Sequence, residues 1–220
     1  MFELNHRNGR TDPRGEFRVV TPRTLNLKRG LSSLAYALGR KYPGLQQRGL
    51  WRRMVQTHWQ DIEYFDDAWR ARIRQMAEFI PANATVMDLG CGPGWLGEII
   101  DPQSYTGVDY LARKEDTVVC DFNKRQFPEF RRDVAFVSGC LEYIEDYRWF
   151  IAQICDKADV CIVSYCLLEI HQDLAARRRA GWVNDLTLDD IKREFAGHGF
   201  RLSAETMTPT RNTIVVFQRK

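Results

Sequence analysis

The stretch 84–97 reads Ala-Thr-Val-Met-Asp-Leu-Gly-Cys-Gly-Pro-Gly-Trp-Leu-Gly and constrains the fold more than any other part of this chain. Its apolar beginning is typical of a short buried strand. Three alternating glycines, Gly90, Gly92 and Gly94, then predict a turn that a ligand can approach without meeting a Cβ atom. Apolar residues at helical spacing over 95–100 predict a helix, whose N-terminus would offer unpaired N–H groups to acceptor atoms. A strand, a glycine turn and a helix in this order are the setting of a nucleotide-binding loop.

Strand and helix patterns alternate downstream of this turn. Further strands are predicted over 105–109, 117–120, 134–138, 160–164, 200–204 and 213–218, and helices over 147–156 and from the Thr187–Asp190 capping box to His198. Such alternation predicts an α/β fold with a mostly parallel, doubly wound sheet of about seven strands that ends in a C-terminal antiparallel hairpin.

The residues ahead of the glycine turn divide into two predicted parts. Residues 1–30 are polar and without periodicity, which predicts a basic extended arm. Residues 31–82 are predicted to form an N-terminal helical cap, with helices over 31–42, 50–59 and 61–80. Residues 83–220 are then the ligand-binding domain.

Charge is spread unevenly along the chain. Through residue 55 there are twelve basic and three acidic side chains, a net charge of +9, whereas the whole chain carries +3. A basic arm of this kind contacts nucleic acid, an anionic membrane or an acidic substrate, or it is a solvated extension.

The cysteine pattern predicts neither a metal site nor a disulfide framework. The six cysteines stand singly in or beside apolar segments, with no Cys-x-x-Cys pair and no Cys/His cluster. Apolar runs are too short to cross a bilayer, and residues 1–30 contain no signal-peptide core. We therefore expect no transmembrane segment, reduced cysteines and a cytoplasmic protein.

Two aspartates near the glycines narrow the choice of nucleotide. Asp109 follows the turn by about twenty positions at the end of the next strand, where a carboxylate accepts hydrogen bonds from two ribose hydroxyls. That chemistry suits both NAD and S-adenosylmethionine. Asp88, two positions before the first glycine, would repel the pyrophosphate of NAD, whereas S-adenosylmethionine carries an ammonium and a sulfonium.

At these residues the chain resembles the class I S-adenosylmethionine-dependent methyltransferases, over about residues 61–220. The motif Asp88-Leu-Gly90-Cys-Gly92 is similar to the first family motif, and Asp109-Tyr110 to the second. Asp121-Phe122 resembles the acidic motif that faces the adenine amino group, and the strand ending at Ser138 resembles the fourth motif, beside the methionine moiety. The resemblance implies S-adenosyl-L-methionine as the cofactor, held by residues Asp88, Gly90, Cys91, Gly92, Asp109, Tyr110, Asp121, Phe122 and Ser138.

Simpler structural roles are open for several of these residues. Asp88 could instead be only a helix cap and Asp121 only a turn former, while Tyr110 would serve equally as a surface tyrosine. One departure from the family pattern is the segment 110–116, which is too short for the helix that usually separates the second and third strands.

Candidate catalytic residues follow the fourth and fifth motif strands, because ligands of open α/β sheets bind at the carboxyl ends of strands. We expect a general base among His171, Glu142 and Tyr165, with His171 preferred for its ordinary pKa. His171 could instead be a surface histidine, and Glu142 could start a helical turn. The arginines within 175–184 predict either a lid over an anionic or sugar-like acceptor or a plain charged surface.

The absence of two sequence motifs argues against two classes of methyl acceptor. No Asp/Asn-Pro-Pro-Tyr follows the fourth strand, which argues against adenine amino-methylation, and no Pro-Cys dipeptide is present for cytosine C5 methylation. We expect methyl transfer to an oxygen or nitrogen of a small molecule, a sugar or a glycan. The alternatives are an RNA methyltransferase that uses the basic arm, and a non-catalytic S-adenosylmethionine-binding regulator. The oligomeric state is not encoded in these patterns.

Overall fold

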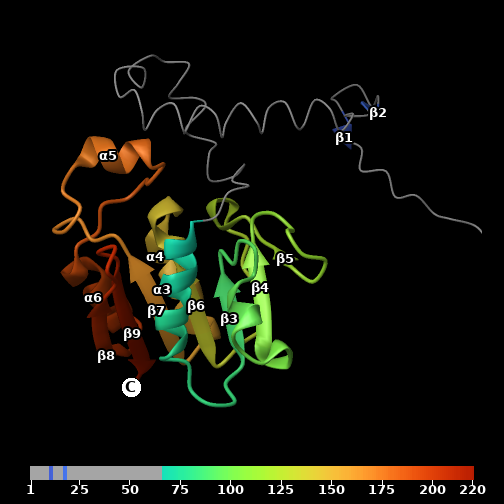
Figure 1. The fold of residues 1–220 in the computed structure, drawn as a ribbon, viewed down its shortest axis with the longest axis horizontal. Coiled ribbons are helices and arrows are strands. Elements are labelled where there is room, and N and C mark those ends of the chain that lie inside the picture. The colour runs from blue at the N-terminus through green and yellow to red at the C-terminus, as the bar shows by residue number, and fades with distance from the viewer. Residues whose placement is uncertain (1–9, 12–16, 19–65) are drawn as a thin grey trace, which may run out of the picture. The chain divides into compact units, whose positions relative to one another are not determined.

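A computed structural model describes residues 10–11, 17–18 and 66–220 of the chain (Figure 1). The chain divides into two units, Met1–Tyr64 and Phe65–Lys220. In the first unit, the strand β1 (Arg10–Thr11) pairs antiparallel with β2 (Phe17–Arg18). The helices predicted over 31–42 and 50–59 lie outside the described residues, as does most of the predicted arm.

The second unit is built on one seven-stranded sheet. Its strands are β3 (Val86–Leu89), β4 (Tyr105–Asp109), β5 (Val118–Val119), β6 (Val134–Ser138), β7 (Val160–Tyr165), β8 (Phe200–Met207) and β9 (Thr213–Arg219). The spatial order is β5-β4-β3-β6-β7-β9-β8. The strands β5, β4, β3, β6 and β7 are parallel, while β9 runs antiparallel to both β7 and β8. The predicted mostly parallel sheet with a C-terminal antiparallel hairpin is confirmed.

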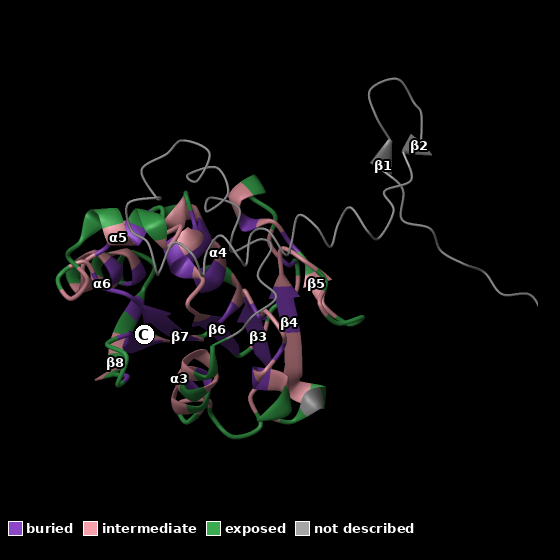
Figure 2. Ribbon diagram, turned by 45° about the horizontal axis from the view of Figure 1, so that its top comes forward, coloured by how far each residue is buried: buried purple, intermediate pink, exposed green. Residues whose placement is uncertain are grey.

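Helices cover both faces of this sheet (Figure 2). On one face lies α3 (Asp67–Ala77), whose Ile73 and Met76 pack against apolar residues of β3, β6, β7 and β9. On the other face lie α4 (Tyr147–Lys157) and α6 (Leu188–Gly197). The helix α5 (Leu174–Arg179) belongs to the segment between β7 and α6. Burial of side chains on both faces explains why the central strands are mostly apolar rather than alternating between apolar and polar residues.

Local sequence signals account for where the long helices begin. Asp66 caps α3 and Asp146 caps α4, each through a side-chain oxygen that accepts a hydrogen bond from a backbone N–H of the first turn. The capping box predicted for α6 is present, because Thr187 Oγ1 accepts from Asp190 N at 3.1 Å and Asp190 Oδ2 accepts from Thr187 N at 3.0 Å.

The structure corrects the helix predicted after the glycine turn. Over 95–100 there is only a single 3-10 turn, η2 (Leu96–Glu98), followed by a second, η3 (Pro102–Ser104). Pro102 disfavours the helical conformation at the residue before it, Asp101. A helix after the glycine turn could therefore span at most the six residues 95–100, which are too few to offset the cost of helix nucleation. Gly97 is also closely packed, because a Cβ atom there would lie 2.9 Å from the ring of Tyr105.

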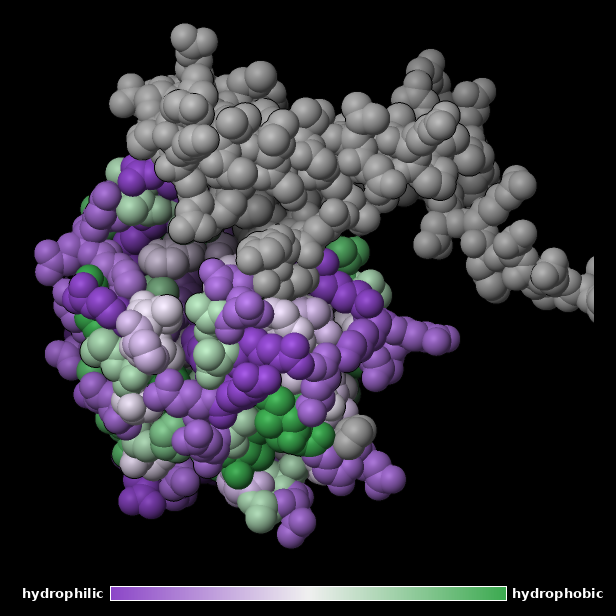
Figure 3. Space-filling model, viewed as in Figure 1, coloured by the Kyte–Doolittle hydropathy of each residue, from purple (hydrophilic) through white to green (hydrophobic). Residues whose placement is uncertain are grey.

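Two predicted bounds also change. The predicted helix over 61–80 is described from Asp67 and ends at Ala77, while residues 61–65 lie outside the described part. The strand expected over 117–120 is only the two residues of β5. Within the described residues, no helix is both long enough and apolar enough to cross a membrane. The face shown in Figure 3 is largely hydrophilic, with hydrophobic side chains gathered in its lower half.

We predict that Thr187→Ala lowers the free energy of unfolding by about 1 kcal/mol, because it removes the side-chain acceptor for one N–H of the first turn of α6. Urea denaturation followed by circular dichroism measures the change. Thr187→Ser keeps the hydroxyl and is expected to stay close to wild type, so equal losses in the two variants would contradict the capping role.

Candidate functional site

The glycine turn lies at the carboxyl end of β3 and is tied to the neighbouring strand. Gly90, Gly92 and Gly94 have φ values of 80°, 54° and 72°, which residues with a Cβ atom rarely adopt. The N–H groups of Gly90 and Cys91 both donate to the carbonyl of Val108, at 2.8 and 3.1 Å. A Cβ atom at Gly90 would lie 2.8 Å from the side chain of Cys140. Both the backbone conformation and the space around it therefore require glycine at this position.

Asp109 closes the turn from the end of β4. Its Oδ2 accepts a hydrogen bond from Gly92 N at 2.8 Å, and its Oδ1 accepts from Leu111 N at 3.1 Å. Each carboxylate oxygen has two lone pairs, so Asp109 can still accept from two hydroxyl groups while it holds the turn.

Asp88 is buried beneath the turn. Its side chain accepts a hydrogen bond from the hydroxyl of Tyr105 at 3.2 Å, so its contact here is not that of a helix cap. The pKa of Asp88 is raised to about 7, because burial and, to a smaller extent, the nearby charge of Asp109 disfavour the ionised form, while the Tyr105 hydrogen bond acts in the opposite direction. A buried carboxyl of this kind gains a proton or a cationic partner easily, which suits a ligand with positive charge.

The other predicted cofactor residues occupy varied surroundings. Asp121 caps the 3-10 turn η4 (Phe122–Lys124), accepting from Asn123 N at 3.2 Å. Phe122 is buried, and its ring lies 4.9 Å from that of Phe150, so its side chain belongs to the core. Tyr110 is half-buried. For Phe122, a cofactor role would therefore have to come from the backbone.

Glu142 enters the carboxyl edge from the short turn η5 (Leu141–Tyr143), which follows β6. The side chain is 2% exposed. Its Oε1 accepts from the backbone N–H of Cys166 at 3.0 Å, whereas Oε2 has no hydrogen-bond partner among the described residues. Burial raises the pKa of Glu142, and the charge of Arg72 opposes that rise. A buried acceptor without a donor is costly and is a common mark of a functional site.

Arg72 is the site residue that sequence patterns did not indicate. It extends from α3 to the end of β6, where its Nε donates to Ser138 Oγ at 3.0 Å. One terminal nitrogen donates to Asn212 Oδ1 at 2.9 Å, beside the start of β9. These partners are 66 and 140 residues away in the chain, so no local motif relates them.

Tyr165 and His171 are placed very differently. The Tyr165 side chain is fully buried, and its hydroxyl contacts Asn184 Oδ1 at 2.5 Å and accepts from Leu186 N and Arg177, each at 3.0 Å. The Tyr165 hydroxyl is thus engaged by groups of the protein, and its catalytic role stays a prediction. His171 is half-buried and its Nε2 lies 2.9 Å from the carbonyl oxygen of Arg211.

The predicted arginine lid has a structural arginine at its centre. Arg177 is 1% exposed, and it donates to Asp185 at 2.7 Å and to the carbonyl of Cys166 at 2.6 Å. Its guanidinium also lies 4.8 Å from the centre of the Trp182 ring. Arg177 therefore fastens the segment 166–187 to the end of β7, and it is not available to an acceptor. Arg178 and Arg179 are exposed and paired with Asp185 and Asp173.

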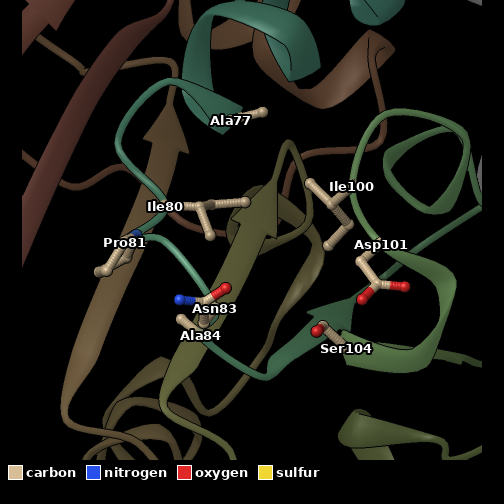
Figure 4. A pocket seen from close by; sticks show the side chains of 8 residues that line it. All are labelled: Ala77, Ile80, Pro81, Asn83, Ala84, Ile100, Asp101 and Ser104. Atoms are coloured by element: carbon tan, nitrogen blue, oxygen red, sulfur yellow. The ribbon is translucent and has the colours of Figure 1, made fainter.

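A pocket of about 360 Å³ lies at the opposite edge of the sheet (Figure 4). It is lined by Ala77, Ile80, Pro81, Asn83, Ala84, Ile100, Asp101 and Ser104. These residues precede β3 and β4, whereas ligands of open α/β sheets bind beyond the carboxyl ends of the strands. The candidate site is therefore the edge that carries Asp88, Asp109, Glu142 and Arg72.

Comparisons with known proteins identify the family of this chain. The family model described as "Methyltransferase domain" matches residues 60–205. No curated protein matches the chain.

Several solved structures share the fold. A 1,6-didemethyltoxoflavin-N1-methyltransferase from Burkholderia thailandensis, solved with 1,6-didemethyltoxoflavin and S-adenosylhomocysteine, has a TM-score of 0.57 at 16% identity, over 93% of each chain. A magnesium protoporphyrin IX methyltransferase from Synechocystis PCC 6803 with bound SAH has a TM-score of 0.55 at 15% identity, over 80% of this chain and 96% of the other. An O-methyltransferase from neocarzinostatin biosynthesis, in complex with S-adenosylmethionine and 2-hydroxy-5-methyl naphthoic acid, has a TM-score of 0.54 at 13% identity, over 96% and 81%.

We predict that Asp88 makes the protein less stable as the pH rises from about 4 to about 7. Its folded pKa is above the unfolded value, so the folded state holds the proton more tightly and loses that advantage as the carboxyl ionises. Asp88→Asn should remove a slope of up to roughly 1.4 kcal/mol per pH unit, measured by urea denaturation of the cofactor-free protein. Asp67→Asn, on the first turn of α3, is the control. Parallel pH profiles for wild type and Asp88→Asn would contradict the shifted pKa.

Proposed function

Since the chain belongs to the S-adenosylmethionine-dependent methyltransferases of class I, we propose that it methylates an oxygen or nitrogen of a small molecule, sugar or glycan. The observation that carries the proposal is the juxtaposition of the glycine turn, tied to Asp109, with the buried and half-satisfied carboxylate of Glu142. Two similar structures hold a small molecule, 1,6-didemethyltoxoflavin in one and 2-hydroxy-5-methyl naphthoic acid in the other, which supports this acceptor class.

The cofactor is S-adenosyl-L-methionine, and we assign its site to the carboxyl ends of β3, β4 and β6. Asp109 offers two carboxylate oxygens to the ribose hydroxyls while it holds Gly92. Asp88 places a buried carboxyl beneath a cationic ligand; burial raises its pKa by disfavouring the ionised form, and the positive charge of the ligand would offset that penalty. The positive φ of Gly90, Gly92 and Gly94 lets a ligand lie close to the backbone. Asp121, Tyr110 and the end of β6 at Ser138 would complete the site.

The methyl group reaches the acceptor from a sulfonium, which needs no activation by the protein. The chain's own contribution is to align the acceptor atom with the methyl group and to take up a proton. When bound, S-adenosylmethionine would supply the methyl group on a sulfonium, and its departing sulfur would keep the electron pair of the carbon–sulfur bond. The acceptor's proton then passes to a base.

Glu142 is the base that the geometry favours. Oε2 is unpartnered, and Oε1 is fixed by Cys166 N, so the carboxylate is oriented before an acceptor arrives. Its raised pKa brings its proton affinity closer to that of a neutral-pH base. His171 is the second candidate. Because a carbonyl oxygen only accepts, His171 Nε2 must carry the hydrogen toward Arg211, which leaves Nδ1 as the basic nitrogen.

We predict that S-adenosylmethionine and S-adenosylhomocysteine bind the protein in calorimetry and that NAD does not. Asp109→Ala should weaken the binding of both by about tenfold or more, because the hydroxyl acceptors are lost. Asp116→Ala, in the loop before β5, is the matched control. Absence of binding by either ligand to the wild type would contradict the proposed site.

We also predict that Glu142→Gln lowers methyl transfer at least about tenfold while the affinity for S-adenosylhomocysteine stays within about twofold, because the amide cannot accept the proton. His171→Ala is the parallel variant, compared under the same conditions. Transfer of a tritiated methyl group to small-molecule extracts supplies the assay. A larger loss in His171→Ala than in Glu142→Gln would assign the base to His171.

A further inference from the structure

The turn η5, which carries Glu142, is held from outside by the dipeptide Val183-Asn184. The side-chain Nδ2 of Asn184 donates to the carbonyl oxygens of Leu141 at 2.8 Å and Ile144 at 2.9 Å. The backbone N–H of Val183 donates to the carbonyl oxygen of Glu142 at 2.8 Å. A 3-10 turn of three residues has little stability of its own, so these contacts from a distant part of the chain decide where the backbone of Glu142 lies.

Asn184 is itself fixed and is only 9% exposed. Its Oδ1 accepts a hydrogen bond from the hydroxyl of Tyr165, and its backbone carbonyl accepts one from Arg177 at 3.0 Å. The carbonyl groups of η5 can only accept and an amide nitrogen can only donate, so the side chain has one orientation in which every partner is matched. In that orientation both N–H donors of the amide are used on η5.

The carboxylate of Glu142 is held by the same set of hydrogen bonds from its other end. Its Oε1 accepts from the backbone N–H of Cys166 at 3.0 Å, and the carbonyl of Cys166 accepts from Arg177 at 2.6 Å. Arg177 therefore contacts both Cys166, which orients the carboxylate, and Asn184, which holds the turn. Backbone and side chain of Glu142 are thus fixed together, while Oε2 has no partner among the described residues.

We propose that Asn184 is a positioning residue for Glu142 as the proton acceptor. It holds η5 where Glu142 Oε1 reaches the N–H of Cys166, and this contact leaves Oε2 in one orientation toward the methyl acceptor. The inference rests on the proposed methyltransferase function, in which Glu142 takes up the proton. Proton transfer needs a heavy-atom distance of about 2.6–3.2 Å, and a misplacement of about 1 Å can cost roughly a hundredfold in rate.

The first measurement is the transfer of a tritiated methyl group to a small-molecule cell extract by the full-length protein at saturating S-adenosylmethionine. Asn184→Ala removes both donors, and Asn184→Asp keeps the size of the side chain but replaces its NH2 group by an oxygen. We expect each variant to lower the rate at least about tenfold while the affinity for S-adenosylhomocysteine stays within about twofold. In the Glu142→Gln background the same substitutions should have no further effect, because Asn184 acts only through Glu142.

The second measurement follows Glu142 without any methyl acceptor. In protein isotope-labelled at the cysteine amide nitrogens, the NMR signal of the Cys166 amide reports the ionisation of the carboxylate that accepts from it, and Cys166→Ser identifies that signal. We expect the signal to shift with pH in the wild type and not in Glu142→Gln. In both Asn184 variants the shift should fall by at least about half, because the hydrogen bond to the ionised carboxylate is weakened.

Thr187→Ala is the matched control. It removes the cap of α6 only three residues beyond Asn184, where Thr187 is bonded to Asp190, and should keep both the methyl-transfer rate and the pH shift of the Cys166 amide. Binding of S-adenosylhomocysteine shows that each variant is folded.

Three results would overturn the positioning role. The first is an equal loss of rate from the Asn184 variants with and without Glu142, or from Thr187→Ala. The second is a Cys166 amide that does not respond to pH in the wild type, or that responds fully in the Asn184 variants. The third is failure of both Asn184 variants to bind S-adenosylhomocysteine. Absence of cofactor binding by the wild type would instead refute the proposed function itself, and the amide signal keeps the two failures apart.

Discussion

The backbone N–H groups of Gly90 and Cys91 both donate to the carbonyl of Val108. These two hydrogen bonds hold the glycine turn, just after β3, against the neighbouring strand β4. Gly92 then donates a hydrogen bond to the Asp109 carboxylate. This contact stabilises the positive φ angles of the turn, which glycine adopts more easily than other residues. Everything else at the carboxyl edge is arranged around this turn. Cys140, in the turn after β6, packs against Gly90, and Asp88, at the end of β3, is buried.

The buried polar side chains at the carboxyl edge of the sheet differ in whether their hydrogen-bonding groups have partners. Tyr165, Arg177 and Asn184 exchange hydrogen bonds among themselves and with the backbone, so their burial costs little. Glu142 is different, since one oxygen is bonded and the other is bare. A fold retains such an imbalance at a cost in stability, and ligand binding is the usual compensation. The contrast between these neighbours is what distinguishes scaffold from site.

The parts of the fold that depend on local signals could be predicted from the sequence. Apolar runs gave the bounds of β6 correctly, and the Thr187–Asp190 pair gave the start of α6, because each rests on residues within a few positions of one another. The helix after the glycine turn was wrong because helical spacing over six residues does not repay nucleation. Arg72 was overlooked, and the enclosure of Tyr165 not foreseen, because their environments come from residues far away in the sequence. Arg72 would have required knowing that α3, β6 and the β8–β9 hairpin meet.

The buried Arg177 also bears on the mobility of the segment that follows β7. If the segment 167–187 moved away from the end of β7, the guanidinium of Arg177 would lose its hydrogen bonds to Tyr165 and to the Cys166 carbonyl together. Breaking a buried charged network of this kind typically costs about 3–5 kcal/mol. The segment is consequently held to the end of β7 as part of the rigid scaffold of the domain.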